Sequence, residues 1–416
     1  MNYKYESFDE IIRTFSTSKG TLGLERLQLF LRELGNPESD YIALQVAGTN
    51  GKGSICTLLQ DSLSRSGIKS GLTISPHLLE WEERIRIQDR LIPAQHLREL
   101  LLEIGPLSKK FSLTPFELIT AAAFVYFSRQ RVNIAVLEVG LGGRLDATSI
   151  HPHRQILGFA SIGEDHHEFL GPDLISIARE KAAILNPGAI AISAPQRKEV
   201  AQVLENEAIR VGAELRWVKP LDWPSSLGGK IQSYNSAVVL GMIEAMAPLG
   251  WYLSKGIIQS AFQNADWPSR YQIINWEGHK ILVDGAHNPP AARALRSEVD
   301  SYGKASIFWI IGVLANKNAP EMIEALLCPL DQAWIVPVPN HISWDSDSLS
   351  AACNKNKDQI KSANNLYTAL DLVCDKIANR DKVYPPIIVV TGSLYLASTL
   401  LKDPIAKKTL KHNDES

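Results

Sequence analysis

A nine-residue segment, VAGTNGKGS (46–54), brings together the residue types that bind phosphate groups: three glycines, a lysine and a serine. Glycines let a loop turn so that its N–H groups point toward an anion, and the positive end of a following helix adds to the attraction. In such a loop Lys52 can reach terminal phosphates and Ser54 can reach a magnesium ion. The segment departs from the usual P-loop pattern, since Val46 stands where the first glycine belongs and Gly53 separates Lys52 from Ser54. The spacing favours phosphate binding over the alternative, a tight strand-to-helix turn without a ligand.

A carboxylate follows a second apolar run, in LEVGLGGRLDAT (137–148). Glu138 falls within or at the end of a predicted strand, where a buried charge is costly unless it is paired or bound to a metal ion. At the carboxyl edge of a parallel sheet Glu138 could meet the phosphate loop and offer oxygen to magnesium. Pairing with an arginine is the common structural alternative, and both remain open.

Three further groups sit where structural roles are commoner than chemical ones. In GEDHHEFLG (163–171) two adjacent histidines cannot easily both bind one ion from a loop, so at most one is expected to be a ligand. Lys181 lies on a predicted amphipathic helix, where a lysine is usually a solvated charge. Asp284 and His287 follow a strand in VDGAHNPPA (283–291), where a turn or a helix cap is the commoner role.

The elements that must position these residues are short apolar runs alternating with longer amphipathic segments. Near-continuous apolar strands separated by helices are typical of parallel sheets covered on both faces, so both halves are predicted to be α/β. Strands are predicted over 42–48, 133–140, 189–194, 280–285, 306–312, 332–338 and 386–392, and helices over 55–65 and 176–185. A chain of 416 residues is too long for one ordinary core, and a fresh series of strands follows NADWPSRYQ (264–272). We therefore expect two domains, 1–268 and 269–416.

Composition argues against several classes of function. The net charge of −2 disfavours nucleic acids and anionic membranes as partners. The four cysteines, Cys56, Cys328, Cys353 and Cys374, form no CxxC pair, which fits a reducing cytoplasm and gives no thiolate metal site. The N-terminal residues lack the apolar core of a signal peptide, and no apolar run approaches the roughly 18 residues that cross a bilayer. No Gly-x-Ser-x-Gly, HExxH or EF-hand pattern supports a hydrolase or a zinc enzyme. We expect a cytoplasmic protein.

Taken together, these segments resemble the folylpolyglutamate synthase/dihydrofolate synthase family, which belongs with the ATP-dependent ligases that also build the peptidoglycan stem peptide. The similar blocks follow one another through nearly the whole chain. They are GLERL (23–27), VAGTNGKGS (46–54), SPHL (75–78), ERIRI (83–87), LTPFE (113–117), LEVGLGGRLDAT (137–148), DHHEFLGPD (165–173), AREKAAI (178–184), WPSRYQI (267–273), DGAHNP (284–289) and TGSLYLAS (391–398). Gly53 favours the folate branch, because the peptidoglycan ligases carry the hydroxyl residue directly after the lysine. The resemblance implies a P-loop-type, mostly parallel N-terminal ATPase domain and a smaller Rossmann-like α/β C-terminal domain.

The resemblance also implies cofactors and catalytic residues. The matched ATP contacts are Asn50, Gly51, Lys52, Gly53, Ser54, Asn235, Arg270 and Asp284. The matched magnesium ligands are Ser75, Glu138 and His166, whereas His167 falls where the family uses no ligand. Lys181 matches a lysine that similar enzymes carry as a carbamate, and Lys52, Lys181 and His287 are the predicted catalytic residues. ATP and Mg²⁺, with two ions expected, are the implied cofactors.

For the second substrate, the resemblance implies a pterin site. The matched residues are Thr114, Phe116, Glu117, Leu145, Asp146 and Ala147. Two positions depart from the family pattern: Pro115, where an aromatic residue is often found, and Ser149, where asparagine is commoner. Phe116 is expected to offer a stacking face, and Asp146 or backbone groups beside it to accept N–H donors of the ring.

The implied reaction is amide ligation, in which ATP converts a carboxylate to an acyl phosphate and the amine of L-glutamate displaces phosphate. The pattern Arg144-Leu145-Asp146-Ala147, with SPHL and LTxFE, predicts that dihydropteroate is accepted as well as tetrahydrofolate. The partners would then be small molecules, and the enzyme is expected to be a monomer. A peptidoglycan-precursor ligase is a rival, although only 45 residues precede Val46, too few for a UDP-sugar domain. An ATP-binding regulatory module without ligase chemistry is the rival from another class.

Overall fold

The computed structural model describes residues 7–17, 23–302, 306–378 and 387–406. Contacts within the chain divide it into two compact units. Unit 1 comprises Met1–Ser226 and Ile231–Asp266, and unit 2 comprises Leu227–Lys230 and Trp267–Ser416. The change of domain predicted at 268 therefore falls close to the Asp266–Trp267 junction. The assignment of residues 227–230 to unit 2 was not predicted from the sequence.

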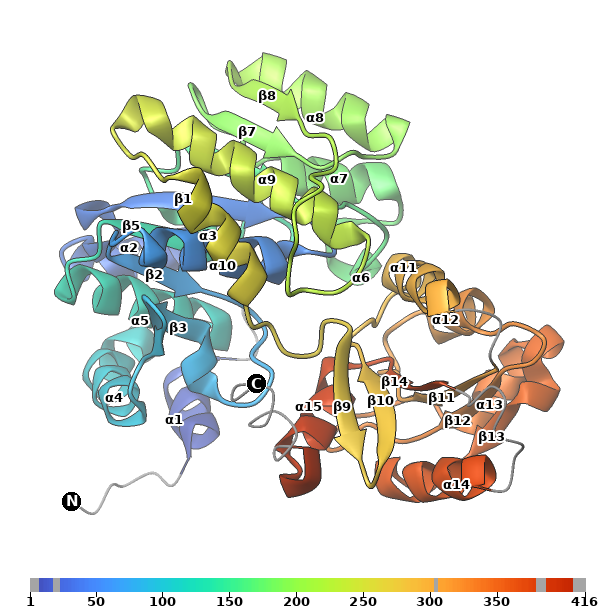
Figure 1. Cartoon of the computed structure of the whole chain (residues 1–416). Coiled ribbons are helices and arrows are strands. Elements are labelled where there is room, and N and C mark those ends of the chain that lie inside the picture. Colours follow the sequence, from blue (N-terminus) through green and yellow to red (C-terminus); the bar gives the residue numbers. More distant parts are fainter. Residues whose placement is uncertain (1–6, 18–22, 303–305, 379–386, 407–416) are drawn as a thin grey trace. The chain divides into compact units, whose positions relative to one another are not determined.

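Unit 1 is built on an eight-stranded sheet in the order β4-β3-β2-β5-β1-β6-β7-β8 (Figure 1). Its strands are β1 (Ile42–Ala47), β2 (Ser70–Thr73), β3 (Ile85–Ile87), β4 (Arg90–Leu91), β5 (Ile134–Glu138), β6 (Ile156–Phe159), β7 (Ile190–Ser193) and β8 (Glu214–Trp217). Neighbouring strands from β2 to β8 run parallel, and β3 and β4 pair antiparallel at one edge. The central strand β1 is almost wholly buried, which explains why all its residues except Gln45 are apolar.

Helices cover both faces of this sheet. They are α1 (Phe8–Phe15), α2 (Glu25–Glu33), α3 (Lys52–Arg65), α4 (Ala94–Lys110), α5 (Pro115–Arg129), α6 (His167–Leu170), α7 (Leu174–Ala182), α8 (Lys198–Val211), α9 (Ile231–Met246) and α10 (Lys255–Asn264), with 3-10 turns η1 (Pro37–Asp40), η2 (Trp81–Arg84), η3 (Ala147–Ile150) and η4 (Ala247–Leu249). Helix α3 packs on β2 and β5 and is covered in turn by α9 and α10 (Figure 1). It is therefore buried on two sides, which fixes the loop that precedes it.

Unit 2 is a second α/β layer with a six-stranded sheet in the order β13-β12-β11-β14-β10-β9. Its strands are β9 (Gln272–Trp276), β10 (His279–Val283), β11 (Ile307–Ile311), β12 (Gln332–Ile335), β13 (Ile360–Ser362) and β14 (Ile387–Thr391). Its helices are α11 (Pro289–Val299), α12 (Ala319–Leu326), α13 (Ser346–Ala352), α14 (Leu366–Ala378) and α15 (Leu394–Lys402), with 3-10 turns η5 (Asp300–Tyr302) and η6 (Asn354–Gln359). All pairs except β9 with β10 are parallel, as in a Rossmann-like sheet.

The predicted fold class is confirmed, and each predicted strand is present with different bounds: β10 begins one residue earlier than predicted, and β12 ends three residues earlier. Pro386, in the last predicted strand, lies outside the described residues. The helix predicted over 55–65 begins earlier, at Lys52, and the helix predicted over 176–185 ends at Ala182. Within the described ranges, no helix combines the length and apolar character that a membrane span requires.

Candidate active site

Four strand ends carry most of the residues singled out by the sequence. Strands β2, β5, β1 and β6 are parallel neighbours, so their carboxyl ends share one edge of the sheet of unit 1. The register pairs Val46 in β1 with Glu138, the last residue of β5, and pairs Ala47 with Phe159 in β6. The loop that follows β1 is therefore flanked by Glu138 on one side and by the loop after β6 on the other.

The phosphate-loop segment turns sharply between β1 and α3. Gly48 and Gly51 have φ angles of 145° and 98°, a region that side chains strongly disfavour. A Cβ atom at Gly51 would also lie 2.6 Å from Oδ1 of Asn235, so glycine is required there for space as well. The N–H groups of Thr49 and Asn50 both donate to the carbonyl of Ser161, at 2.7 and 3.2 Å. These bonds fix Thr49 and Asn50 in the first half of the loop. The second half, from Lys52 onward, is already the start of α3.

Helix α3 opens toward this edge. It begins at Lys52, and no side chain in the described ranges caps its N-terminus. The N–H groups of a first helical turn have no intrahelical acceptor and form a natural anion site. The Nζ of Lys52 donates to the carbonyl of Thr49 at 3.3 Å, so the lysine folds back over its own loop. Buried Ser54 accepts from Nε2 of Gln232 on α9 at 3.3 Å.

Ser75 and Glu138 lie together beside this loop. The backbone N–H of Ser75 donates to Oε2 of Glu138 at 3.2 Å, and only 6% of Glu138 is exposed. Among the described residues, no three His, Cys, Asp or Glu side chains gather in a group that could hold a metal ion. Mg²⁺ is commonly held by one or two carboxylates together with substrate phosphates and waters, and a carboxylate and a hydroxyl next to a phosphate loop fit that pattern.

His166 belongs to the loop after β6, which is tied to the phosphate loop. The Oγ1 of Thr49 donates to the carbonyl of Gly163 at 2.9 Å and accepts from its N–H at 3.0 Å. His166 has a left-handed backbone, with φ 55°, and its N–H donates to Oδ1 of Asp165 at 2.9 Å. Its ring is 37% exposed. His167 is already the first residue of α6, so the two adjacent histidines occupy different backbone conformations.

Lys181 does not point into solvent. Only 5% of it is exposed, and its Nζ donates to the carbonyl of Gly48 at 2.9 Å. Burial, assisted by the charge of Lys52, lowers the pKa of Lys181 from 10.5 to about 7, against the opposite influence of Asp165 and Asp146. The structural alternative of a solvated helix lysine is therefore wrong at this position, and a large fraction of its amine is neutral near pH 7.

Asp146 is buried within the GLGGRLDAT segment. Its Oδ2 accepts the N–H groups of Gly140 and Leu141, both at 2.9 Å, and its Oδ1 accepts the N–H and Oγ1 of Thr148, at 3.0 and 2.6 Å. Burial raises the pKa of Asp146, and these hydrogen bonds oppose the rise. With 4% of the residue exposed, the carboxylate holds its own loop. This geometry does not support the predicted direct contact of Asp146 with a pterin ring.

Phe116 links the LTPFE segment to the same loop. A Cβ atom at Gly140 would lie 2.5 Å from Cζ of Phe116, so the ring packs directly on the glycine backbone. Phe116 is only partly buried, which leaves surface for a ligand. Leu145 is also half-buried, whereas Ala147 lies in the hydrophobic core. Two predicted substrate segments thus meet around Phe116 and Gly140.

Thr114 and Glu117 form the capping box of α5. The N–H of Thr114 donates to Oε2 of Glu117 at 2.8 Å, and the N–H of Glu117 donates to Oγ1 of Thr114 at 3.3 Å. Arg26 also reaches Oε2 of Glu117, at 2.9 Å. Pro115 occupies the first position of the helix, where its fixed φ and missing N–H are favourable. These contacts give Thr114, Pro115 and Glu117 a structural role at the helix start.

A buried polar network behind the sheet edge was missed by sequence reasoning. Gln45 in β1 donates to Thr148 and Ser149 at 2.8 and 3.0 Å, and Nη1 of Arg154 donates to Oε1 of Gln45 at 2.6 Å. Ser149 also donates to the carbonyl of Gly143 at 2.7 Å. A glutamine within an otherwise apolar strand was the available signal. Ser149, a departure from the family pattern, thus holds the GLGGRLDAT segment to β1.

Asn235 and Gln232 lie together on α9 beside the phosphate loop. The Nδ2 of Asn235 donates to Oε1 of Gln232 at 2.9 Å. Asn235 is 1% exposed, and its Oδ1 has no hydrogen-bond partner in the described structure. The sequence pointed to Asn235 but not to Gln232. Their spacing of three residues on one helical face was a usable signal.

In unit 2, Asp284 organises the end of β10. Its Oδ2 accepts the N–H of Tyr271 at 3.0 Å and its Oδ1 accepts that of Ala286 at 2.8 Å. Burial raises its pKa and nearby Arg270 lowers it. The Nδ1 of His287 lies 2.8 Å from the carbonyl of Gly285, which can only accept, so Nδ1 carries the proton and Nε2 is the basic nitrogen. The cap of α11 is Asn288, so Asp284 serves the turn and neither predicted residue caps the helix.

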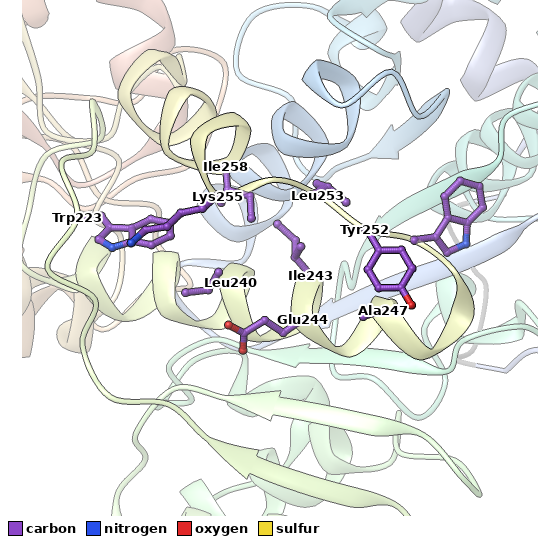
Figure 2. Close-up of a pocket in the computed structure, with 10 residues that line it drawn as sticks. Trp223, Leu240, Ile243, Glu244, Ala247, Tyr252, Leu253, Lys255 and Ile258 are labelled. Carbon is purple, nitrogen blue, oxygen red and sulfur yellow. The ribbon is translucent and has the colours of Figure 1, made fainter.

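A separate pocket of about 420 Å³ opens between α9 and α10 (Figure 2). It is lined by Trp223, Leu240, Ile243, Glu244, Ala247, Trp251, Tyr252, Leu253, Lys255 and Ile258. Lys255 already stacks on Trp223, with its Nζ 5.3 Å from the ring centre. None of the residues predicted from the sequence lines this pocket. The chemistry-bearing groups of unit 1 gather instead at the sheet edge around the phosphate loop.

The chain is similar to proteins of known function in both sequence and structure. The family model described as "Dihydrofolate synthetase, C-terminal domain" matches residues 269–403. A dihydrofolate synthetase from Saccharomyces cerevisiae is 31% identical over 422 residues, covering 92% of this chain and 97% of that protein. The structure of E. coli FolC in complex with DHPP and ADP is 28% identical, with a TM-score of 0.83 and 97% of each chain covered.

A bifunctional folylpolyglutamate synthase/dihydrofolate synthase from Yersinia pestis, complexed with AMPPNP and Mn ion, is also similar. It is 26% identical, with a TM-score of 0.79 over 94% of this chain and 95% of that one. The chain is thus similar to these proteins over nearly its full length, and it also has the glycine-rich loop, the carboxylate beside it and the two α/β units. The chain belongs to the dihydrofolate synthase/folylpolyglutamate synthase family of ATP-dependent ligases.

Proposed function

We propose that this enzyme uses ATP to join L-glutamate to 7,8-dihydropteroate and, as a second activity, extends tetrahydrofolate with glutamate. The γ-phosphoryl group of ATP passes to the substrate carboxylate, which forms an acyl phosphate and releases ADP. The glutamate nitrogen then attacks the acyl carbon, phosphate leaves, and the nitrogen loses its proton. The observation that carries the proposal is the β1–β5 register, which sets Glu138 directly beside the glycine-rich loop.

The phosphate groups would be bound by the start of α3 and by Lys52. The supporting features are the helix N-terminus without a side-chain cap and the position of Lys52 over its own loop. When ATP enters, Lys52 exchanges the carbonyl of Thr49 for phosphate oxygens, a stronger acceptor because it is charged. The backbone of Asn50, Gly51 and Gly53 would line the phosphate site, and Asn235 offers an amide oxygen beside Gly51. Catalysis then rests on positioning and on charge neutralisation.

Magnesium would be held by Ser75, Glu138 and His166. The family relative with AMPPNP and Mn ion supports a divalent cation next to the nucleotide. A bound ion neutralises the phosphoryl charge and orients the phosphate chain. The contribution of this chain is to orient the buried carboxylate of Glu138, partly through the N–H of Ser75.

Lys181 is proposed to carry a carbamate. Its amine is buried, about half neutral near pH 7, and close to the positive charge of Lys52. Nucleophilic attack by the neutral amine on CO₂, with loss of a proton, gives an N–CO₂⁻ group. That anion would face Lys52 as an opposite charge, where the ammonium faces it as a like charge. The modification therefore relieves the electrostatic cost of burying this lysine.

The pterin ring is proposed to stack on Phe116, next to Gly140. The argument rests on a partly exposed aromatic face packed on the glycine backbone of the second loop. Leu145 would supply apolar contact. Asp146 is reassigned from a direct contact to a residue that fixes Gly140 and Leu141 in place. Replacement of Asp146 is still expected to impair the use of dihydropteroate, because without its carboxylate the loop that packs under Phe116 would no longer be held in place.

In unit 2, Arg270 and Asp284 remain proposed nucleotide contacts. His287 is proposed to accept the proton that the glutamate nitrogen releases. Its Nε2 is the basic nitrogen because Nδ1 is committed to the carbonyl of Gly285. The peptidoglycan-ligase alternative has no observation in its favour, and neither has a regulatory module without ligase chemistry.

The test is a product analysis with defined acceptors. ATP, MgCl₂ and L-glutamate are supplied with dihydropteroate, with tetrahydrofolate, or with neither, and the products are weighed by mass spectrometry. A ligase forms ADP only when acid and amine are both present, whereas a regulatory nucleotide-binding module would turn over ATP without an acceptor. Asp146→Ala should lose use of dihydropteroate. Unimpaired use of dihydropteroate by this variant would contradict the assignment of the loop.

A further inference from the structure

The pocket between α9 and α10 lies entirely within unit 1 and contains none of the residues assigned to ATP, magnesium or the pterin ring (Figure 2). Its floor is aliphatic, since Ile243 on α9 and Ile258 on α10 both line it and are each only 3% exposed. Its volume of about 420 Å³ is within the range of small-molecule sites, which are mostly apolar and carry a few polar groups. The pocket therefore has the size and the lining of a ligand site that no step of the proposed reaction uses.

One wall of the pocket is the ring of Trp223. This ring packs on the fully buried ring of Phe262, with the ring centres 5.9 Å apart. Two backbone hydrogen bonds hold the segment around it: the N–H of Leu221 donates to the carbonyl of Ser233 at 3.0 Å, and that of Ser226 donates to the carbonyl of Phe262 at 2.9 Å. This aromatic wall is therefore in place before any ligand arrives.

The opposite wall comes from the segment that joins the two helices. The N–H of Trp251 donates to the carbonyl of Met246 at 3.3 Å, which ties this wall to the end of α9. Tyr252 also lines the pocket and is 76% exposed, and Leu249, three residues earlier, is 42% exposed. Large apolar side chains left in solvent at the rim of a hollow are typical of a binding surface. A ligand with an aromatic ring would cover part of this surface.

The charge available to a ligand in the pocket is positive. Of the ten described residues that line it, Lys255 is the only cation, and its Nζ lies 5.3 Å from the ring centre of Trp223. Glu244 is the only anion among them, and Figure 2 shows its carboxylate pointing away from Lys255. The pKa of Arg216 on β8 is raised by its hydrogen bond to Glu214 and further by the charge of Glu244, so that charge acts toward β8.

We propose that this pocket binds a planar aromatic carboxylate. The ring of the ligand lies on the aliphatic floor between Trp223 and Trp251, where offset or edge contacts between aromatic rings are favourable. The carboxylate accepts from the ammonium of Lys255, which leaves the face of Trp223 for a charged and therefore stronger acceptor. A polyanion such as a nucleotide is a poor match, because the lining offers a single cation. This inference does not depend on the proposed function.

The experiment follows the binding of 2-naphthoate to the full chain, labelled with 5-fluorotryptophan, by ¹⁹F NMR. The chain has nine tryptophans, and the variants Trp223→Phe and Trp251→Phe assign two of the nine signals. Added 2-naphthoate should shift these two signals with a Kd of about 1 mM, as expected for a ligand of this size. The uncharged 2-naphthamide should bind about fourfold more weakly, the size of an exposed ion pair. Shifts confined to other tryptophans, or none at all, would overturn the inference.

Three variants test the role of the charge and the location of the site. Lys255→Met should bind 2-naphthoate about fourfold more weakly and should no longer distinguish it from the amide. Lys198→Met is the matched control, because Lys198 is also exposed and is the first residue of its helix, α8; it should bind normally. Phe116→Ala, which alters the proposed pterin site, should leave the shifts unchanged. Equal losses in the two lysine variants, equal affinities for acid and amide, or loss of the shifts in Phe116→Ala would each contradict the proposal.

Discussion

Replacing Lys181 by methionine should stabilise the protein while abolishing its activity. The ammonium of Lys181 is buried, and its pKa lies at about 7 in the folded protein against 10.5 as its ordinary value. Between these two values folding must remove a proton that the unfolded chain retains, at about 1.4 kcal/mol for each pH unit below 10.5. At pH 8 this cost is about 3 kcal/mol, and methionine of similar length does not incur it.

The hydrogen bond from Lys181 to Gly48 offsets part of that gain, by about 1 kcal/mol. The variant should therefore be about 2 kcal/mol more stable than the parent at pH 8, and close to it at pH 9.5, where the cost of deprotonation falls to about 1.4 kcal/mol. The sign follows because a lowered lysine pKa makes the parent more stable as pH rises through this window. Urea unfolding in CO₂-free buffers at the two pH values measures the difference.

Bicarbonate provides the second half of this assay. Added bicarbonate should stabilise the parent, because the CO₂ in equilibrium with it adds covalently to Lys181 only in the folded state, and should leave Lys181→Met unchanged. Short carboxylic acids should restore part of the activity of Lys181→Ala, where a cavity replaces the side chain. A methionine variant less stable than the parent at pH 8 would refute the view that Lys181 is buried at a cost. A parent that ignores bicarbonate would refute the carbamate.

The remaining predictions concern single residues. Lys52→Met and Glu138→Gln should each keep stability within about 2 kcal/mol and lose ligation by several orders of magnitude, whereas near-normal turnover in either folded variant would exclude its assigned role. In a magnesium titration of ligation, His166→Asn should raise the required concentration and His167→Asn should not; the reverse order would show that the wrong histidine was chosen. Burial lowers the pKa of His151 to about 3 from 6.5, so the parent should lose about 2 kcal/mol of stability between pH 7 and pH 5, and His151→Phe, followed by urea unfolding, should lose much less.

The sequence predicted the framework well because its signals are local and strong. Apolar runs such as 42–48 and 306–312 were predicted to be buried strands, and in the structure they are β1 and β11. Seven of the strands that the structure describes were missed: β2, β3, β4, β6, β8, β9 and β13. In β2 and β6 the reason is that SGLT and ILGF are four residues long and carry glycine, which weakens the pattern. In the fold those glycines are useful, since Gly158 makes room for Met242 of α9.

The candidate site was only partly visible in the sequence. Glycine, lysine and serine spacing pointed to the phosphate loop, and the strand register then brought Glu138 beside it. What the sequence could not give is burial. Lys181 reads as a surface helix residue until the fold covers it, and Asp146 reads as a ligand contact until its oxygens are found to hold Gly140 and Thr148. The contact of Lys181 with Gly48 joins residues far apart in the chain, whereas the contacts of Asp146 are local and depend on how its own loop folds.

The central claim is that this family member makes dihydrofolate, and the most direct measurement is the mass of its product. The enzyme is incubated with dihydropteroate, ATP, MgCl₂ and ¹⁵N-labelled L-glutamate. The account predicts one labelled glutamate joined to dihydropteroate, with one ADP formed for each amide. Extension of tetrahydrofolate alone, with dihydropteroate recovered unchanged, would contradict it.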